Sequence, residues 1–276
     1  MRQILLIGGD HDVVRLIAQR LAKMQCAHEF AAGHADALRR LRLRSFDVVI
    51  TDPVTSVDED LALIEEMRRI CPGIKIIILS SHNAPEDVIA ALRARVFACF
   101  SAPFDASAIA EMAGQASEGE WRSDIEVLSA EPEWVSLRVN CRLLTAERLI
   151  TFLNELRSDL PDRRREQLMM AFREILMNAM EHGAGFNAER VVDVVAVRTA
   201  RTVVFYVRDP GAGFRTDSIP HAAVSNSPDD PMAHLEYRAA EGMRPGGYGI
   251  LLVRGVVDEL IYNEFGNEVL LVKYLV

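Results

Sequence analysis

Glu174 and Asn178 stand four residues apart in the second half of the chain, within a run whose apolar residues recur at helical spacing. Residues at this separation lie on one face of a helix. A solvated helix face explains many such polar pairs. Asn is a weak helix former, however, and its carbonyl is a hard oxygen ligand that suits Mg²⁺. The pair is therefore a candidate metal-binding position.

Asp209, Gly211 and Gly213 directly follow the apolar run 202–207, which the alternation of residue types predicts to be a strand. Two glycines at this spacing let the backbone approach a ligand without Cβ atoms in the way. A carboxylate at the end of a strand can accept a hydrogen bond from an exocyclic amine. The plainer alternative is an ordinary glycine-rich turn.

A third motif, at Arg244, Gly247 and Gly249, opens a predicted helix over 249–260. Backbone N–H groups at a helix N-terminus beside glycines can hold phosphate, although a glycine cap alone would give the same pattern. The spacing fits neither a P-loop nor a dinucleotide-binding fingerprint.

The elements around these motifs predict an α+β domain over residues 134–276. Strands are expected at 135–139, 191–197, 202–207, 260–263 and 269–275, with helices at 146–160 and 161–181. The polar loop 215–245 contains four Pro and is a candidate lid over the site.

The first 116 residues have a different pattern, in which five short apolar runs alternate with amphipathic helices. This order predicts a doubly wound, flavodoxin-like α/β domain with a five-stranded parallel sheet. Residues 117–133 are acidic and weakly periodic, and we expect them to be a linker.

Composition narrows the class of protein further. The 276 residues carry a net charge of −9, which makes nucleic acid and anionic membranes poor partners. The four Cys are scattered and form no CxxC pair, and the sequence shows no apolar run long enough to span a membrane and no signal peptide. We therefore expect a cytoplasmic protein with reduced thiols.

Together the three motifs resemble the N, G1 and G2 boxes of the GHKL ATP-binding fold, over roughly residues 134–276. The resemblance implies that ATP and Mg²⁺ are bound. Asn178 would hold the metal, Asp209 would contact the adenine amino group, and Gly211, Gly213, Gly247 and Gly249 would line the nucleotide. Glu174 would be the general base, and Arg244 would lie near the γ-phosphate.

Within that fold, the chain is most similar to the anti-sigma-factor serine kinases of the SpoIIAB and RsbW group. The resemblance implies phosphorylation of a Ser or Thr on a STAS-domain anti-anti-sigma protein, binding of a sigma factor, and a possible homodimer. Two alternatives are an ATP-dependent partner switch without catalysis and an orphan histidine-kinase-like ATPase. The absence of His between Trp121 and Glu181 argues against the last.

Residues 1–116 resemble a response-regulator receiver domain. Asp52 stands where the phosphoacceptor is expected, and Ser80 matches the switch hydroxyl. Ala102 replaces the usual Lys, and Gly8-Gly9 replaces the acidic pair, leaving Asp10 as the nearest carboxylate. Without those charges a divalent cation and a phosphoryl group are poorly held, so we expect little or no phosphorylation of Asp52.

Overall fold

The computed structural model describes residues 3–82, 84–118, 123–157, 159–214, 230, 232–240 and 247–275. Within 232–240, only the backbone is described at residues 234 and 237–239. The chain forms two compact units. One comprises Met1–Ser123 with Thr151–Ser158, and the other comprises Asp124–Ile150 with Asp159–Val276.

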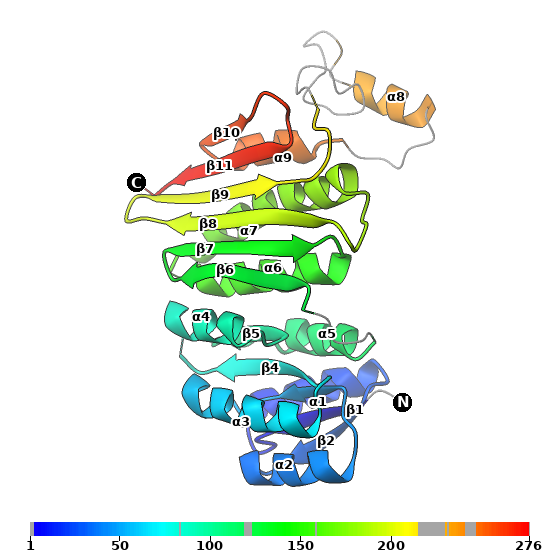
Figure 1. Ribbon diagram of the computed structural model, residues 1–276, viewed down its shortest axis with the longest axis vertical. Helices are drawn as coiled ribbons and strands as arrows, with labels where there is room; N and C mark the ends of the chain where they lie inside the picture. Colours follow the sequence, from blue (N-terminus) through cyan, green and yellow to red (C-terminus); the bar gives the residue numbers. More distant parts are fainter. Residues whose placement is uncertain are drawn as a thin grey trace. The chain divides into compact units, whose positions relative to one another are not determined.

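The first unit is a five-stranded sheet in the order β2-β1-β3-β4-β5, and all of its strand pairs are parallel. Helices α1 and α5 pack together, whereas α2 packs on α3 and α3 on α4, so helices cover both faces. The expected doubly wound fold is confirmed (Figure 1). Its elements are β1 (Gln3–Ile7), α1 (Asp12–Lys23), β2 (Ala27–Ala31), α2 (His34–Leu43), β3 (Val48–Ile50), α3 (Val57–Ile70), β4 (Lys75–Ser80), α4 (Pro85–Arg93), β5 (Ala98–Ser101) and α5 (Ala106–Ala116).

Helix α3 begins at Val57, four residues before the start at Leu61 that apolar periodicity predicts. Ser56 and Glu59 form a capping box, in which each side chain accepts a hydrogen bond from the other residue's backbone N–H. The cap therefore adds a first turn that the apolar pattern does not mark.

The second unit is a six-stranded sheet in the order β10-β11-β9-β8-β7-β6, with every neighbouring pair antiparallel. The expected α+β class is confirmed. Its elements are β6 (Ile125–Glu131), β7 (Trp134–Asn140), α6 (Leu143–Leu156), α7 (Asp162–Asn178), a π-helical turn η1 (Ala179–Gly183), β8 (Val191–Arg198), β9 (Thr202–Arg208), α8 (Ala233–Ala240), α9 (Gly249–Val256), β10 (Glu259–Tyr262) and β11 (Glu268–Tyr274).

The core of this unit lies between the sheet and its helices. Residues alternate between buried and partly exposed along β7, β8 and β9, as expected for a sheet with one covered face. Phe205 of β9 packs on Phe172 of α7 with ring centroids 4.6 Å apart, so α7 covers that face. Figure 1 shows α7 and α9 behind the sheet.

Strand β6 corrects the prediction that residues 117–133 are a linker throughout, because it occupies Ile125–Glu131. The register with β7 shifts between Val127 and Ser129, which marks a β-bulge. Ile125 and Ala130, the buried residues of β6, are an odd number of positions apart, because the bulge inserts an extra residue between them. The insertion breaks the alternation of buried and exposed residues by which a strand is recognised.

Three helices and one loop also differ from the predictions. The helix expected over 146–160 spans Leu143–Leu156. The helix expected over 161–181 ends at Asn178 and continues as a π-helical turn, and the helix expected over 249–260 ends at Val256. The loop expected over 215–245 contains α8, and most of the rest of that loop is outside the described residues. In the described part of the chain, no helix is both long enough and apolar enough to cross a membrane.

Candidate nucleotide site

Helix α7 positions the first polar pair. Its apolar face is buried against the sheet, which leaves Glu174 and Asn178 half-buried on another face. Asn178 is the residue from which the π-helical turn Ala179–Gly183 starts. Such turns are rare and occur often at functional sites, because they redirect the chain within a helix.

Gly249, the first residue of α9, lies directly beside this pair. A Cβ atom at Gly249 would be 2.7 Å from Glu174 Oε2 and 3.8 Å from Asn178 Nδ2. The start of α9 therefore meets the polar face of α7, and free N–H groups at a helix start favour an anion there. A carboxylate, an amide and a helix N-terminus thus converge from two motifs that are about 70 residues apart in the sequence.

Asp209 follows the last residue of β9 and lies against Gly183 at the end of the π-helical turn. A Cβ atom at Gly183 would be 2.5 Å from Asp209 Cβ, so only glycine fits at that position. Gly211 N donates a hydrogen bond of 2.8 Å to Asp209 Oδ1. Burial raises the pKa of Asp209, and the Gly211 hydrogen bond opposes that shift.

The turn between β10 and β11 holds the Asp209 loop from the other side. Asp209 N donates to Asn267 O at 3.0 Å, and Gly213 crosses so close to Phe265 O that no side chain could be placed there. Gly213 also has a φ of +78°, which favours glycine. The rings of Phe214 and Tyr262 meet edge to face, with centroids 5.3 Å apart.

The structure brings together Glu174, Asn178 and Gly249 at one point, and Asp209, Gly211 and Gly213 at another. Gly247 lies two residues before α9 with a φ of +93°. Arg244 lies outside the described residues.

Two supporting residues escape motif analysis of the sequence. Gly183 reads as an ordinary glycine after a helix, and Asn267 as an ordinary turn residue, since neither lies in a motif with Asp209. The sequence does hold one signal for the role of Gly183, because a glycine directly after a helix can mark a close approach of another segment as well as a helix cap.

Asn178 is the side chain that could ligate Mg²⁺ at this site. No group of three or more His, Cys, Asp or Glu able to hold a metal occurs among the described residues. A single amide ligand fits Mg²⁺ that is held mainly by nucleotide phosphates and water, which is how this ion is usually bound.

The receiver-like unit has its own candidate site at the end of β3, where Asp52 is almost buried. Gly8, with a φ of +78°, lies against the Asp52 side chain, and a Cβ atom there would be 2.5 Å from Asp52 Cγ. His11 Nε2 is 3.4 Å from Asp52 Oδ1, and Val54 N donates to the same oxygen at 3.1 Å. His11 is a neighbour of the Asp52 carboxylate that motif matching missed.

The other two residues expected at this site have different partners. Asp10 is fully exposed and lies 3.8 Å from Arg15 Nη2. The Ser80 hydroxyl lies 2.9 Å from both Asp87 Oδ2 and His82 O, to which it can donate. The described contacts of Asp10 and Ser80 therefore lead away from Asp52.

Comparisons with known proteins agree with this two-part architecture. A model of the response regulator receiver domain matches residues 4–113, and a model of the histidine kinase-like ATPase domain matches residues 140–273. The transcriptional regulatory protein GlrR of Escherichia coli (strain K12) is 26% identical over 158 residues, covering 55% of this chain and 35% of that protein. QseF of Escherichia coli O157:H7 matches with the same values, so the chain spans about a third of the length of these curated relatives.

Solved structures similar to this chain include response regulators. One from Thermotoga maritima is 19% identical, with a TM-score of 0.39 and coverage of 43% of this chain and 100% of that chain. A receiver domain protein from Methanospirillum hungatei JF-1 is 21% identical, with a TM-score of 0.36 and coverage of 42% and 96%. From the two family models and the two folds, the chain consists of an N-terminal response regulator receiver domain and a C-terminal histidine kinase-like ATPase domain.

Proposed function

We propose that this signal-transduction protein is a Mg·ATP-dependent serine/threonine kinase of the anti-sigma-factor type. Its substrate would be a Ser or Thr on a STAS-domain protein, and its receiver domain would regulate the activity without being phosphorylated. The observation that supports this proposal is the position of Glu174 beside Gly249 at the start of α9. A site that only binds nucleotide does not need a carboxylate where the phosphates are expected.

The residues divide the chemistry as follows. Asp209 would accept a hydrogen bond from the adenine amino group, and the turns around Gly211 and Gly213 would leave room for the ring. Asn178 would hold Mg²⁺, which offsets phosphate charge. Backbone N–H groups at the start of α9 would bind phosphate oxygens and stabilise the charge that develops during transfer.

Glu174 would accept the proton of the attacking hydroxyl. The oxygen of the substrate Ser or Thr forms the new bond to the γ-phosphorus while the bond to the ADP oxygen breaks, and the hydroxyl proton passes to the Glu174 carboxylate. A positioned general base of this kind contributes about 10²–10⁴-fold to rate.

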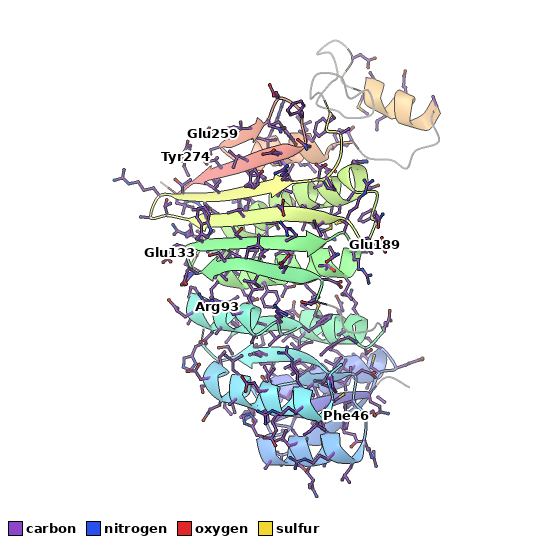
Figure 2. All side chains as sticks on the ribbon, in the orientation of Figure 1. Phe46, Arg93, Glu133, Glu189, Glu259 and Tyr274 are labelled. Carbon is purple, nitrogen blue, oxygen red and sulfur yellow. The ribbon has the colours of Figure 1, made fainter. Side chains whose placement is uncertain are left out.

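The test measures ATP binding by calorimetry and transfer of labelled γ-phosphate to purified STAS-domain proteins. Glu174→Gln is expected to bind ATP like the wild type and to lose about 10²–10⁴-fold in transfer. Asn178→Ala is expected to lose the Mg²⁺ dependence of binding. Glu189→Gln, on an exposed turn labelled in Figure 2, is the matched control and should leave both properties unchanged.

Undiminished transfer by Glu174→Gln would contradict the role of this carboxylate. A wild-type protein that binds ATP and transfers nothing, but binds a sigma factor only with nucleotide present, would favour the non-catalytic partner switch. Failure to bind Mg·ATP at all would contradict both functions.

A further inference from the structure

The turn between β10 and β11 spans residues 263–267 and lies beside residues 209–214, the loop that begins with Asp209 (Figure 1). We call these two segments the hairpin turn and the nucleotide loop. Asp209 N donates to Asn267 O at 3.0 Å, which is one of several contacts between the segments. None of the nucleotide motifs of the sequence includes the hairpin turn, although it touches the residue expected to bind adenine.

Two glycines interlock the backbones of these segments. Gly213 of the nucleotide loop lies against Phe265 O, and a Cβ atom there would overlap that oxygen. Gly266 of the hairpin turn, with a φ of +79°, lies in the same way against Phe214 O. Because each backbone fills the space that a side chain would need on the other, a shift of the hairpin turn displaces the nucleotide loop as well.

Asn263 holds the hairpin turn in this conformation. Its Oδ1 atom accepts hydrogen bonds from three successive backbone N–H groups, at 2.7 Å from Gly266 N, 3.1 Å from Asn267 N and 3.2 Å from Glu268 N. Asn often closes a turn in this way, because its short side chain reaches backbone groups a few residues ahead. Gly266 is buried, so without the Asn263 side chain its N–H would lose its shortest hydrogen bond.

The nitrogen of the same amide connects the hairpin turn to Asp209. Asn263 Nδ2 donates to Asn267 Oδ1 at 2.9 Å. That bond turns Asn267 Nδ2 toward the nucleotide loop, where it lies 3.5 Å from both Asp209 O and Gly211 O. Both backbone groups of Asp209 therefore contact Asn267. The orientation of one amide fixes that of the other, because each N–H group has to face an oxygen.

We propose that Asn263 is a positioning residue of the adenine site and acts through Asn267 on the carboxylate of Asp209. The inference rests on the proposed function, in which Asp209 binds the exocyclic amine of ATP. Gly211 N donates to Asp209 Oδ1 at 2.8 Å, so we assign the amine to Oδ2. A hydrogen bond weakens steeply as its angle departs from a straight line, so the amine is bound well only where the backbone of Asp209 is held in place.

A simpler role for Asn263 is to close the hairpin turn and nothing more. The two roles use different atoms, because Oδ1 closes the turn whereas Nδ2 makes the link to Asn267. Asn263→Asp separates them, since a carboxylate accepts the three N–H bonds but has no hydrogen to donate to Asn267. Asn263→Ala removes both kinds of contact.

Calorimetric titration of the full chain with two nucleotides tests the proposal. Mg·ATP carries the exocyclic amine, and the magnesium complex of purine riboside triphosphate has a hydrogen in its place. We expect the wild type to bind ATP about 10- to 150-fold more tightly than the analogue, because the analogue leaves a carboxylate unpaired. In Asn263→Asp and Asn263→Ala the affinity for ATP should fall about 10-fold, while the affinity for the analogue changes less than about 2-fold.

Thermal unfolding without nucleotide reports the turn-closing role by itself. Asn263→Ala should lower the Tm, and Asn263→Asp should lower it less because the three N–H bonds keep an acceptor. Asn187→Ala is the matched control, since Asn187 Oδ1 accepts from Glu189 N at 2.9 Å in the turn before β8. This control removes an Asn turn contact elsewhere in the same domain and should leave the preference for ATP unchanged.

Two results would overturn this inference and leave the proposed function standing. One is an Asn263→Asp protein that keeps the wild-type preference for ATP over the analogue. The other is an equal loss of affinity for both nucleotides, which would mean that Asn263 only supports the fold. A wild type that does not bind Mg·ATP, or binds it no better than the analogue, would overturn the inference together with the proposed role of Asp209. If circular dichroism shows Asn263→Ala to be unfolded, Asn263→Asp decides.

Discussion

Gly183 lies directly against the side chain of Asp209, where the π-helical turn after α7 meets the loop after β9. The contact joins the end of the helix that carries Asn178, the proposed metal ligand, to the residue expected to bind adenine. It leaves no space for a Cβ atom, so the position of the carboxylate depends on a glycine 26 residues earlier in the chain.

Gly183→Ala is therefore expected to displace Asp209 and to weaken ATP binding. A lost charge-assisted hydrogen bond of about 1.5–3 kcal/mol corresponds to about a 10- to 150-fold rise in Kd. Calorimetric titration with Mg·ATP measures the change, and circular dichroism checks that the fold is kept.

The matched control for this experiment is Gly255→Ala in α9. A Cβ atom at Gly255 meets nothing within 4 Å, so the variant should bind ATP normally. Alanine should also stabilise the helix slightly, since glycine in a helix costs roughly 0.5–1 kcal/mol relative to alanine. Equal ATP affinity of Gly183→Ala and the wild type would show that Asp209 does not need this packing.

Asp52 is expected to take up little or no phosphate from acetyl phosphate in the presence of Mg²⁺. His11 and Gly8 lie against its carboxylate, and Gly8 occupies the place of a second carboxylate, so the site has few oxygen ligands for a divalent ion. Mass spectrometry of the treated protein measures the modification, with a competent receiver domain treated in parallel. A phosphorylated species that disappears in Asp52→Asn would refute the expectation.

Asp60 should make the stability of the receiver domain depend on pH. Burial raises the pKa of this fully buried carboxyl, while hydrogen bonds from Thr51 and Thr55 and the neighbouring His34 oppose the shift. The folded state therefore binds more protons than the unfolded state between the two pKa values. The contribution of Asp60 to stability is present below its unfolded pKa and is lost as pH rises through the folded pKa.

Asp60→Asn isolates this effect because an amide does not titrate. The difference in free energy of unfolding between the variant and the wild type is expected to shift in favour of the variant as pH rises from about 4. Urea denaturation at a series of pH values measures it, and Asp58→Asn on the exposed side of α3 is the control. A difference that stays constant with pH would contradict the predicted linkage.

Cys141 should resist alkylation in the folded protein. Burial raises the pKa of its thiol to about 11, and the charge of Asp209 adds to the shift, so little thiolate is present at pH 8. Cys71 is partly exposed and should react first with iodoacetamide, as mapped by mass spectrometry. Reaction of Cys141 at the rate of Cys71 would show that its surroundings open to solvent in solution.

The sequence by itself determined both fold classes and the residues of the nucleotide motifs. Glu174 and Asn178 share a helix face because they are four residues apart. The glycines near Asp209 and at the start of α9 mark positions where the backbone can approach another group closely, whatever the fold around them. Alternating apolar runs likewise predict strands without knowledge of their partners.

Only the tertiary structure decided which distant residues meet. Gly183 against Asp209, Gly249 against Glu174, and His11 beside Asp52 each join segments that no local pattern connects. Strand β6 escaped prediction because its bulge breaks the two-residue period, and pairing with β7 supplies the hydrogen bonds that define it. Local periodicity reports which face of an element is apolar, whereas contacts between elements follow from how those faces pack.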